Sequence, residues 1–234
     1  MNEFGDAFHT ALVMIVSANP DLIEIVGLSL RVSLSAVVIA ALLGMPLGAA
    51  LAVFAFPGRR AVVVAINALM GLPPVVVGLT VYLMLSRGGP LGVLGLLFTP
   101  GAMIVAQVVL VLPIVAALTR QTVEDLWLEY REQLVSLGVT PRRAVRTMLW
   151  DGRITLLTAF LAGFGRASAE VGAVIIVGGN IDHLTRVMTT AIALETSKGD
   201  LALALALGLV LLAVSFAVNA AAQILRDMVV RAQG

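Results

Sequence analysis

The 234-residue chain contains no cysteine, only two histidines, and few charged (12%) or aromatic (5%) residues. Without cysteine it can form no disulfide, thiol nucleophile or thiolate metal site, which leaves its redox compartment open. Hydrophobic residues make up 60% of the chain, which excludes an ordinary soluble domain. His9 and His183 stand far apart without metal-ligand spacing, so we interpret both as polar residues outside the bilayer core. The net charge of +1 gives no reason to expect nucleic acid as a partner.

Motifs that carry enzymatic chemistry are also missing. The chain has no Ser/His/Asp set at plausible depth, no HExxH, no carboxylate cluster for a metal, and no Gly-rich phosphate loop ending in Lys-Ser/Thr. We therefore expect no catalytic residue and no cofactor in this chain. The chain also has no ATP-binding motif, so any ATPase that acts with it must be a separate polypeptide.

Long apolar runs predict an all-α, polytopic membrane helix bundle that forms one domain over residues 1–234. Five spans are expected, at about residues 25–56, 62–85, 101–118, 154–177 and 201–222. Pro73 and Pro74 predict a kink or local unwinding in the second span. The segment 91–98 is too short to cross, and the apolar piece 188–194 is expected outside the membrane or at its surface.

The first 21 residues contain acidic residues but no Lys or Arg, so a secretory signal is not expected here. Within them, Phe8, Leu12, Ile15 and Val16 predict a short helix that lies at the membrane interface.

The one long polar segment between the apolar runs is residues 124–153, within a predicted cytoplasmic loop of about 120–153. Trp127, Tyr130, Leu134 and Leu137 recur at helical spacing and predict a first short amphipathic helix. Gly138 suits the left-handed residue that ends a helix. Thr140 and Pro141 are typical of the start of a second helix.

The second predicted helix of this loop has two different faces. Its apolar side comprises Ala144, Val145, Met148 and Leu149, and its opposite side carries Arg142, Arg143 and Arg146. A capped helix–Gly turn–helix favours a docking element on the membrane domain. A surface helix pair packed only on its own domain is the alternative.

Basic residues predict the orientation. Ten arginines lie on the side of the long loop: Arg59, Arg60, Arg120, Arg131, Arg142, Arg143, Arg146, Arg153, Arg226 and Arg231. The other side holds Arg31, Arg87, Arg186 and Lys198. This asymmetry predicts that the loop and the C-terminus are cytoplasmic and, with five spans, that the N-terminus is outside.

Arg166 and Glu170 are the one charge pair expected at bilayer depth, at i and i+4 of the fourth span. Charges at this depth are costly, so the pair should face protein or water rather than lipid. It could line a translocation path or gate, or it could be a structural pair that fixes helix packing.

The spacing of Glu132, five further residues and Gly138 resembles the EAA loop of the permease subunits of ABC importers. The sequence departs from that pattern at Gln133 and Leu134, where small residues are usual, and at 148–151, where Ile-x-Leu-Pro is degraded. Residues 166–200 and 70–92 resemble oxyanion permeases of this kind. They are most similar to the permease subunit of tungstate importers, with a resemblance from about residue 24 onward.

The resemblance implies a type I importer in the prokaryotic cytoplasmic membrane. Two copies of the chain would form the pore, two ATP-binding subunits would hold ATP and Mg, and an extracytoplasmic binding protein would deliver tungstate. The implied ATPase-coupling residues are Glu132, Leu134, Gly138, Thr140, Pro141 and Arg142, and the candidate path residues are Arg166, Glu170 and Asn180.

Other readings stay open at this point. Molybdate or another oxyanion could be the substrate. A secondary transporter would show paired inverted halves with unpaired acids at the midplane. A non-transporting membrane scaffold would need no docking element.

Overall fold

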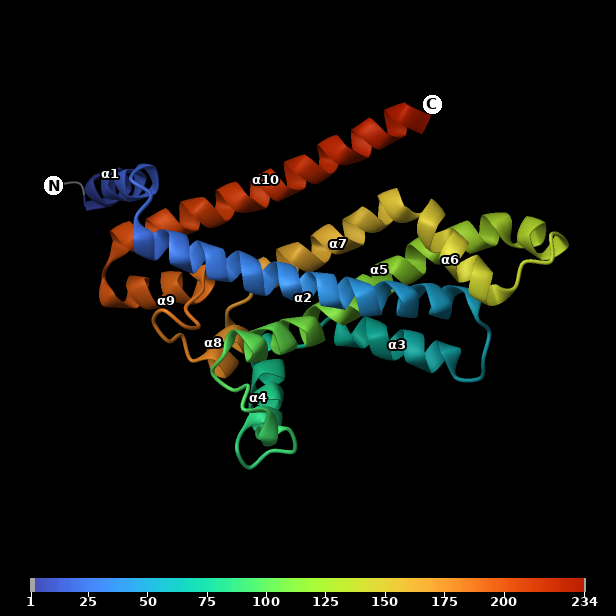
Figure 1. The fold of residues 1–234 in the computed structure, drawn as a ribbon, viewed down its shortest axis with the longest axis horizontal. Coiled ribbons are helices and arrows are strands. Elements are labelled where there is room, and N and C mark those ends of the chain that lie inside the picture. Colours follow the sequence, from blue (N-terminus) through green and yellow to red (C-terminus); the bar gives the residue numbers. More distant parts are fainter. Residues whose placement is uncertain (1–2, 234) are drawn as a thin grey trace. The chain divides into compact units, whose positions relative to one another are not determined.

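Helices make up most of the chain in the computed structural model, which describes residues 3–233 apart from the side chains at 3, 4, 225, 226 and 229–233. The described part contains α1 (Glu3–Val16), α2 (Pro20–Val53), α3 (Arg59–Leu69), α4 (Pro74–Leu85), η1 (Gly92–Leu94), α5 (Pro100–Ser136), α6 (Pro141–Asp151), α7 (Arg153–Ser168), α8 (Gly172–Gly178), α9 (Met188–Lys198) and α10 (Leu201–Gln233) (Figure 1). The side chains of Arg226 and Arg231, which support the predicted orientation, lie outside the described ones.

Contacts divide the chain into two compact units, each assembled from three separated segments. Unit 1 comprises residues 1–35, 74–107 and 168–220, and unit 2 comprises residues 36–73, 108–167 and 221–234. Neither unit is continuous in sequence.

In unit 1, α1 and α9 pack with the first turns of α2 and α10 (Figure 1). Their shared core consists of small and branched side chains: Ala11, Leu22, Ile25, Met188, Ala191, Ala206 and Leu207. The start of α2 is fixed by Asn19, whose side-chain oxygen accepts hydrogen bonds from the backbone N–H groups of Asp21 (3.0 Å) and Leu22 (3.4 Å). The hydroxyl of Ser29 accepts the N–H of Met188 at 2.7 Å, which ties α2 to α9.

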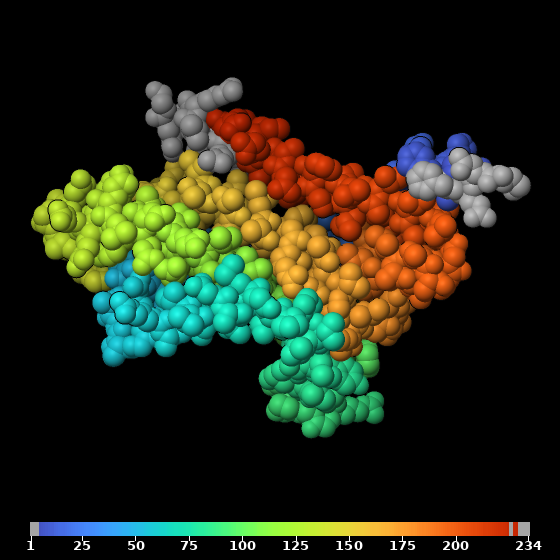
Figure 2. Space-filling view, turned by 180° about the vertical axis from the view of Figure 1, so that it is seen from behind, coloured from blue at the N-terminus to red at the C-terminus, as the bar shows by residue number. Residues whose placement is uncertain are grey.

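Also in unit 1, α4 and α8 lie side by side (Figure 1). They approach closely because Gly78 has no side chain: a Cβ there would lie 2.7 Å from the Cα of Ala173. The segment that follows α4 contains η1 and rejoins this pair where the N–H of Phe98 donates to the carbonyl of Val177 at 2.9 Å. Figure 2 shows this segment, in green, at the surface.

In unit 2, the C-terminal part of α2 packs against α3, the second half of α5, and α6. One core cluster contains Leu51, Ile66, Ala116 and Ala117. The other contains Ala49, Ala52, Val53, Val123, Ala144 and Met148. Gly48 allows α2 and α5 to approach closely at the cluster that contains Ala116, since a Cβ at Gly48 would lie 2.3 Å from the carbonyl oxygen of Ala116.

Among the residues that the structure describes, three helices are long and apolar enough to cross a membrane, and the total rises to five if each of two broken pairs counts as one span. This agrees with the five predicted spans. The N-terminal helix is also confirmed as α1, and its position at the interface stays a prediction. The segment 91–98, predicted to be too short to cross the membrane, contains one short 3-10 helix, Gly92–Leu94.

The predicted interruption of the second span is confirmed, because α3 ends at Leu69 and α4 begins at Pro74. Proline has no N–H to donate, and Pro74 occupies the first position of α4, where no donor is needed.

Two predicted boundaries were wrong. The third span and the first loop helix are one helix, α5, because the charged turn after Thr119 continues the same hydrogen-bonded backbone. The fourth span is broken, because α7 ends at Ser168 and α8 starts at Gly172. The break is stabilised locally: Glu170 Oε1 accepts the N–H of Ala173 (3.1 Å), and Thr189 Oγ1 donates to the carbonyl of Glu170 (2.8 Å).

We predict that Gly78→Ala destabilises the protein by about 1–3 kcal/mol, the usual cost of overpacking a tight helix contact. The added methyl group would overlap the backbone of Ala173, which cannot move aside as a flexible side chain could. The measurement is the melting temperature of the purified protein in detergent. Gly27→Ala in α2 is the matched control, because nothing lies within 4 Å of a Cβ at that position. Equal melting temperatures for the two variants would contradict the role of Gly78.

Candidate functional site

The α5–α6 turn contains Gly138 in the predicted left-handed conformation, with φ of +70°. The N–H of Val139 donates to the carbonyl of Leu134 (2.9 Å), and the N–H of Gly138 donates to that of Val135 (3.0 Å). These two bonds form a Schellman motif, which satisfies the last carbonyl groups of α5. No atom lies within 4 Å of a Cβ at Gly138, so backbone conformation alone favours glycine here.

Thr140 and Pro141 take the predicted positions at the start of α6. Thr140 is the N-cap in extended conformation (φ −70°, ψ 150°), and Pro141 follows in the first turn. The predicted cap by the Thr140 hydroxyl is not made. Its backbone carbonyl instead accepts the N–H of Ala144 at 2.9 Å, so the fixed φ of Pro141 and the backbone start the helix.

The predicted apolar face of α6 is confirmed. Ala144 and Met148 are fully buried against α2 and α5, and Val145 and Leu149 cover their edges. On α5, Trp127, Tyr130 and Leu134 pack on the same core. Leu137 was expected there but is 77% exposed, because α5 ends one residue earlier and the chain turns away.

The polar residues of the turn face outward. Glu132, Thr140, Pro141 and Arg142 are exposed, as are Arg143 and Arg146 further along α6. Figure 2 shows the end of α5 and the start of α6, in yellow-green, at the surface of unit 2. We call this structure, residues 124–153, the α5–α6 hairpin. Its buried side is occupied by its own domain, which leaves its charged side open to a partner.

An ion-pair cluster that sequence reasoning missed lies at the base of the α5–α6 hairpin. Arg59, the first residue of α3, donates to Glu124 Oε1 (2.8 Å) and to the carbonyl of Leu51 (2.6 Å). Arg120 bonds the other oxygen of Glu124, one turn away on α5. All three side chains are partly buried. The cluster joins the end of α2, the start of α3 and the hairpin through charge-assisted hydrogen bonds.

Arg166 and Glu170 do not share one helix as predicted, because α7 ends between them at Ser168. Their pairing stays a prediction. Arg166 is half-buried in the last turn of α7, in unit 2. Glu170 is 4% exposed in the break, in unit 1, where it caps α8.

The structure brings Glu170 and Asn180 together at the first turn of α9. Thr189 binds the carbonyl of Glu170, and the side-chain N–H of Asn180 donates to the carbonyl of Thr190 at 3.4 Å. Asn180 has a φ of +50°, a conformation that asparagine tolerates better than most residues. The backbone carbonyl of Glu170 and the side chain of Asn180 therefore both bind the first turn of α9.

A second missed cluster lies in unit 1, where the loop after α8 meets the start of α2. Nδ1 of His183 lies 2.9 Å from Glu24 Oε2, and Arg186 pairs with Asp182 at 2.7 Å. With Asp21 these side chains line a pocket of about 100 Å³. The hydrogen bond and the charge of Glu24, with a further contribution from Asp182, raise the pKa of His183 above its usual 6.5.

Within the described residues, no group of three or more His, Cys, Asp or Glu side chains could hold a metal ion.

The comparisons with known proteins decide the family. The profile of the family described as binding-protein-dependent transport system inner membrane component matches residues 44–231. The chain belongs to this family. The permease is thus a transport subunit by family membership, and its helical, membrane-spanning architecture agrees with that assignment.

Relatives cover most of the permease. It is 42% identical over 211 residues to a probable anion ABC transporter permease protein of Haloferax volcanii, covering 88% of this chain and 91% of the relative. It is 41% identical over 220 residues to the tungstate uptake system permease protein TupB of Peptoclostridium acidaminophilum, with coverage of 94% and 96%. Identity to the protein of that name in Campylobacter jejuni is 39% over 214 residues, with coverage of 92% and 90%.

We predict that the contact between His183 and Glu24 weakens as pH rises. Because the pKa of His183 is raised in the folded state, the contact stabilises the fold fully below pH 6.5. This stabilisation is lost as the pH rises through the folded-state pKa. Hydrogen exchange of residues 180–186, corrected for intrinsic rates, should accelerate by up to about fivefold between pH 6 and pH 8.5, within the range of exposed ion pairs. His183→Gln should remove this difference. A wild-type profile in that variant would show that another group titrates.

Proposed function

We propose that the permease is the membrane-spanning subunit of an ATP-driven importer, that it acts as a homodimer, and that its substrate is tungstate. The α5–α6 hairpin docks into a separate ATP-binding subunit and conveys the movement of that subunit to the spanning helices. ATP and Mg bind to this partner. An extracytoplasmic binding protein delivers the oxyanion.

The proposal rests on the structure of the α5–α6 hairpin. Its apolar face is buried in its own domain, its turn is held by two backbone hydrogen bonds, and its outer side carries exposed Glu132 and Arg142. A preformed, exposed turn of this kind can bind a protein partner with little ordering cost.

The ion-pair cluster supports a role in transmission. Glu124 connects the hairpin to Arg59, the first residue of α3, and Arg120 on α5 binds the other oxygen of the same carboxylate. The helix α3 leads into a broken span. Movement of the hairpin as a rigid body would therefore pull on α3 directly.

Tungstate is favoured as the substrate because two relatives near 40% identity are named for tungstate uptake. A sulfate transport system permease protein of Salmonella typhimurium is 28% identical over 207 residues, which makes another oxyanion such as molybdate or sulfate the second candidate. We place selectivity mainly in the binding protein, because a path that binds a dianion weakly also releases it.

Gly138 provides the test of coupling. Gly138→Val puts a β-branched side chain at φ of +70°, so it should weaken association with the ATP-binding subunit and lower ATP-driven tungstate uptake about tenfold or more. Uptake is measured in vesicles reconstituted with the permease and its ATPase, with molybdate at equal concentration in parallel, and association is measured by pull-down.

Gly138→Asn is the matched control, because asparagine adopts the left-handed conformation at low cost and should keep both activities. Unchanged pull-down with Gly138→Val would count against docking at this turn. Failure of wild type to bind any ATPase stoichiometrically would favour a secondary transporter or a scaffold. Faster uptake of molybdate than of tungstate would identify molybdate as the better substrate.

The orientation is tested with single cysteines, since the chain has none of its own. We place the N-terminus outside and the C-terminus and the hairpin in the cytoplasm, following the arginine distribution. An impermeant thiol reagent should label His9→Cys in intact cells and should label Ser136→Cys only after permeabilisation. Both positions are exposed in the isolated chain. The reverse pattern would overturn the orientation.

A further inference from the structure

We propose that unit 2 holds a binding site for an anionic phospholipid at the base of the α5–α6 hairpin. The first observation is an open apolar groove of about 460 Å³ between α2 and the start of α7. Leu42, Met45 and Pro46 line it from α2, and Leu157 and Phe160 line it from α7. Leu42 is 69% exposed within this groove, so none of the described residues covers it.

The groove has one charged end. Arg153, the first residue of α7, lines the apolar groove itself. Leu149 lines both this groove and an adjoining hollow that is formed with Arg146, Thr147 and Trp150. Leu149 is common to both hollows, so the apolar one along α2 and α7 adjoins a cationic one where the chain leaves the spanning helices, and we call the two together the surface channel.

The two arginines at this end are available to a ligand. Neither Arg146 nor Arg153 forms an ion pair with any carboxylate among the described side chains. Arg153 is held in place by a hydrogen bond from Nη1 to the carbonyl of Trp150 (2.7 Å) and by the Trp150 ring, whose centroid lies 4.6 Å from its guanidinium carbon. Its remaining N–H groups can donate to a phosphate.

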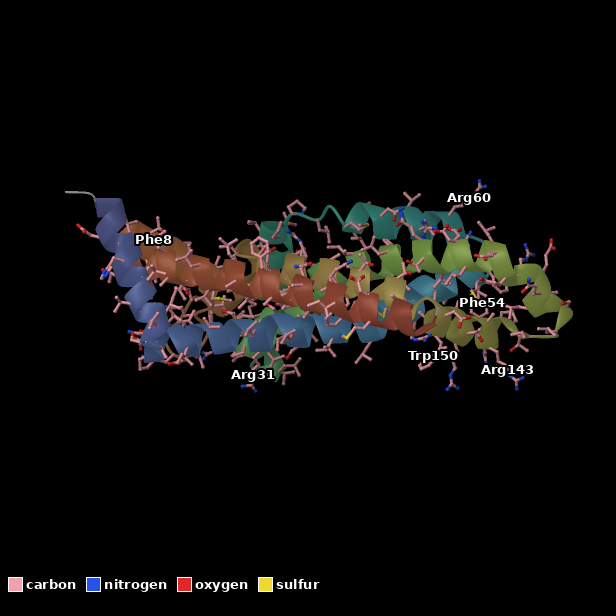
Figure 3. The ribbon with its side chains drawn as sticks, turned by 90° about the horizontal axis from the view of Figure 1, so that it is seen from above. Phe8, Arg31, Phe54, Arg60, Arg143 and Trp150 are labelled. Atoms are coloured by element: carbon pink, nitrogen blue, oxygen red, sulfur yellow. The ribbon has the colours of Figure 1, made fainter. Side chains whose placement is uncertain are left out.

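Trp150 gives the depth of the site. It is 68% exposed on α6, and tryptophan is enriched at the level of the lipid headgroups. Figure 3 shows Trp150 and Arg143 projecting from the same side of unit 2. From Arg153 to Phe160 the helix rises about 10 Å, which matches the upper part of an acyl chain below its phosphate.

A phospholipid fits both ends of the channel. Its phosphate would lie against Arg146 and Arg153, and one acyl chain would fill the groove between α2 and α7. A soluble oxyanion would use the arginines and leave the groove empty, and an uncharged lipid would use the groove and leave the arginines unpaired. A lipid with a net negative headgroup, such as phosphatidylglycerol, is favoured because the guanidinium groups of Arg146 and Arg153 have no carboxylate partner among the described side chains. The site belongs to the inner leaflet under the orientation proposed above, and its existence does not depend on ATPase coupling.

The site is tested by native mass spectrometry of the delipidated full-length permease, titrated with phosphatidylglycerol and with phosphatidylcholine of identical acyl chains. Phosphatidylglycerol should bind at least about fivefold more tightly, from the attraction of two arginines near a membrane surface. The double variant Arg146→Gln/Arg153→Gln should lose this preference. Leu157→Trp should weaken binding of both lipids by filling the groove.

Arg60→Gln is the matched control. Arg60 is an exposed arginine of the same unit that projects from the side opposite to Trp150 (Figure 3), so its loss should leave the preference unchanged. Equal binding of the two lipids by wild type, or an equal effect of Arg60→Gln and the double variant, would overturn the proposal. Displacement of the lipid by millimolar tungstate or phosphate would also overturn it, by showing a simple anion site. The proposal would also be overturned if Leu157→Trp changed the fraction of dimer but not the binding of lipid, because a second copy of the chain would then fill the groove.

Discussion

A hydrocarbon environment supplies no hydrogen bonds, so each interruption of a spanning helix must be satisfied by the protein itself. The permease meets this requirement in unit 1 with a small set of side chains. Glu170 accepts the N–H of Ala173, Thr189 donates to the carbonyl of Glu170, and Thr185 donates to the carbonyl of Gly178 at 2.6 Å. Because these groups are paired within unit 1, α8 can lie beside α4 as a short separate helix.

The same constraint explains where polar side chains are buried. Ser29, Thr185, Thr190 and Glu170 are almost fully buried, and each binds backbone groups at a helix end or in a connecting loop. Glu170 therefore has a structural role, whether or not it also takes part in transport. Its side chain stabilises the start of α8 by accepting the N–H of Ala173. A role in the path remains a prediction.

Local chemistry predicted the α5–α6 hairpin well. Gly138, Pro141 and the apolar spacing of Ala144 and Met148 act over a few residues, and each took its expected position. The boundaries of α5 and α7 were not predictable in the same way. Charges at Arg120 and Glu124 were interpreted as the start of a loop, yet they pair with each other along a continuing helix. No proline marks the break at 169–171, and its capping partner Thr189 is remote in sequence. The contact of His183 with Glu24 joins residues 159 positions apart, so no spacing rule could find it.

The length of α5 has a consequence for what can meet its end. Its apolar part, about residues 101–118, already matches the thickness of the hydrocarbon core, and the 18 residues that follow add about 27 Å at 1.5 Å each. If that apolar part crosses the hydrocarbon core, as predicted, the tip of the helix lies past the headgroup layer, in bulk water. Lipids and other membrane-embedded chains could not reach it there, and only a molecule that approaches from the aqueous phase could bind it.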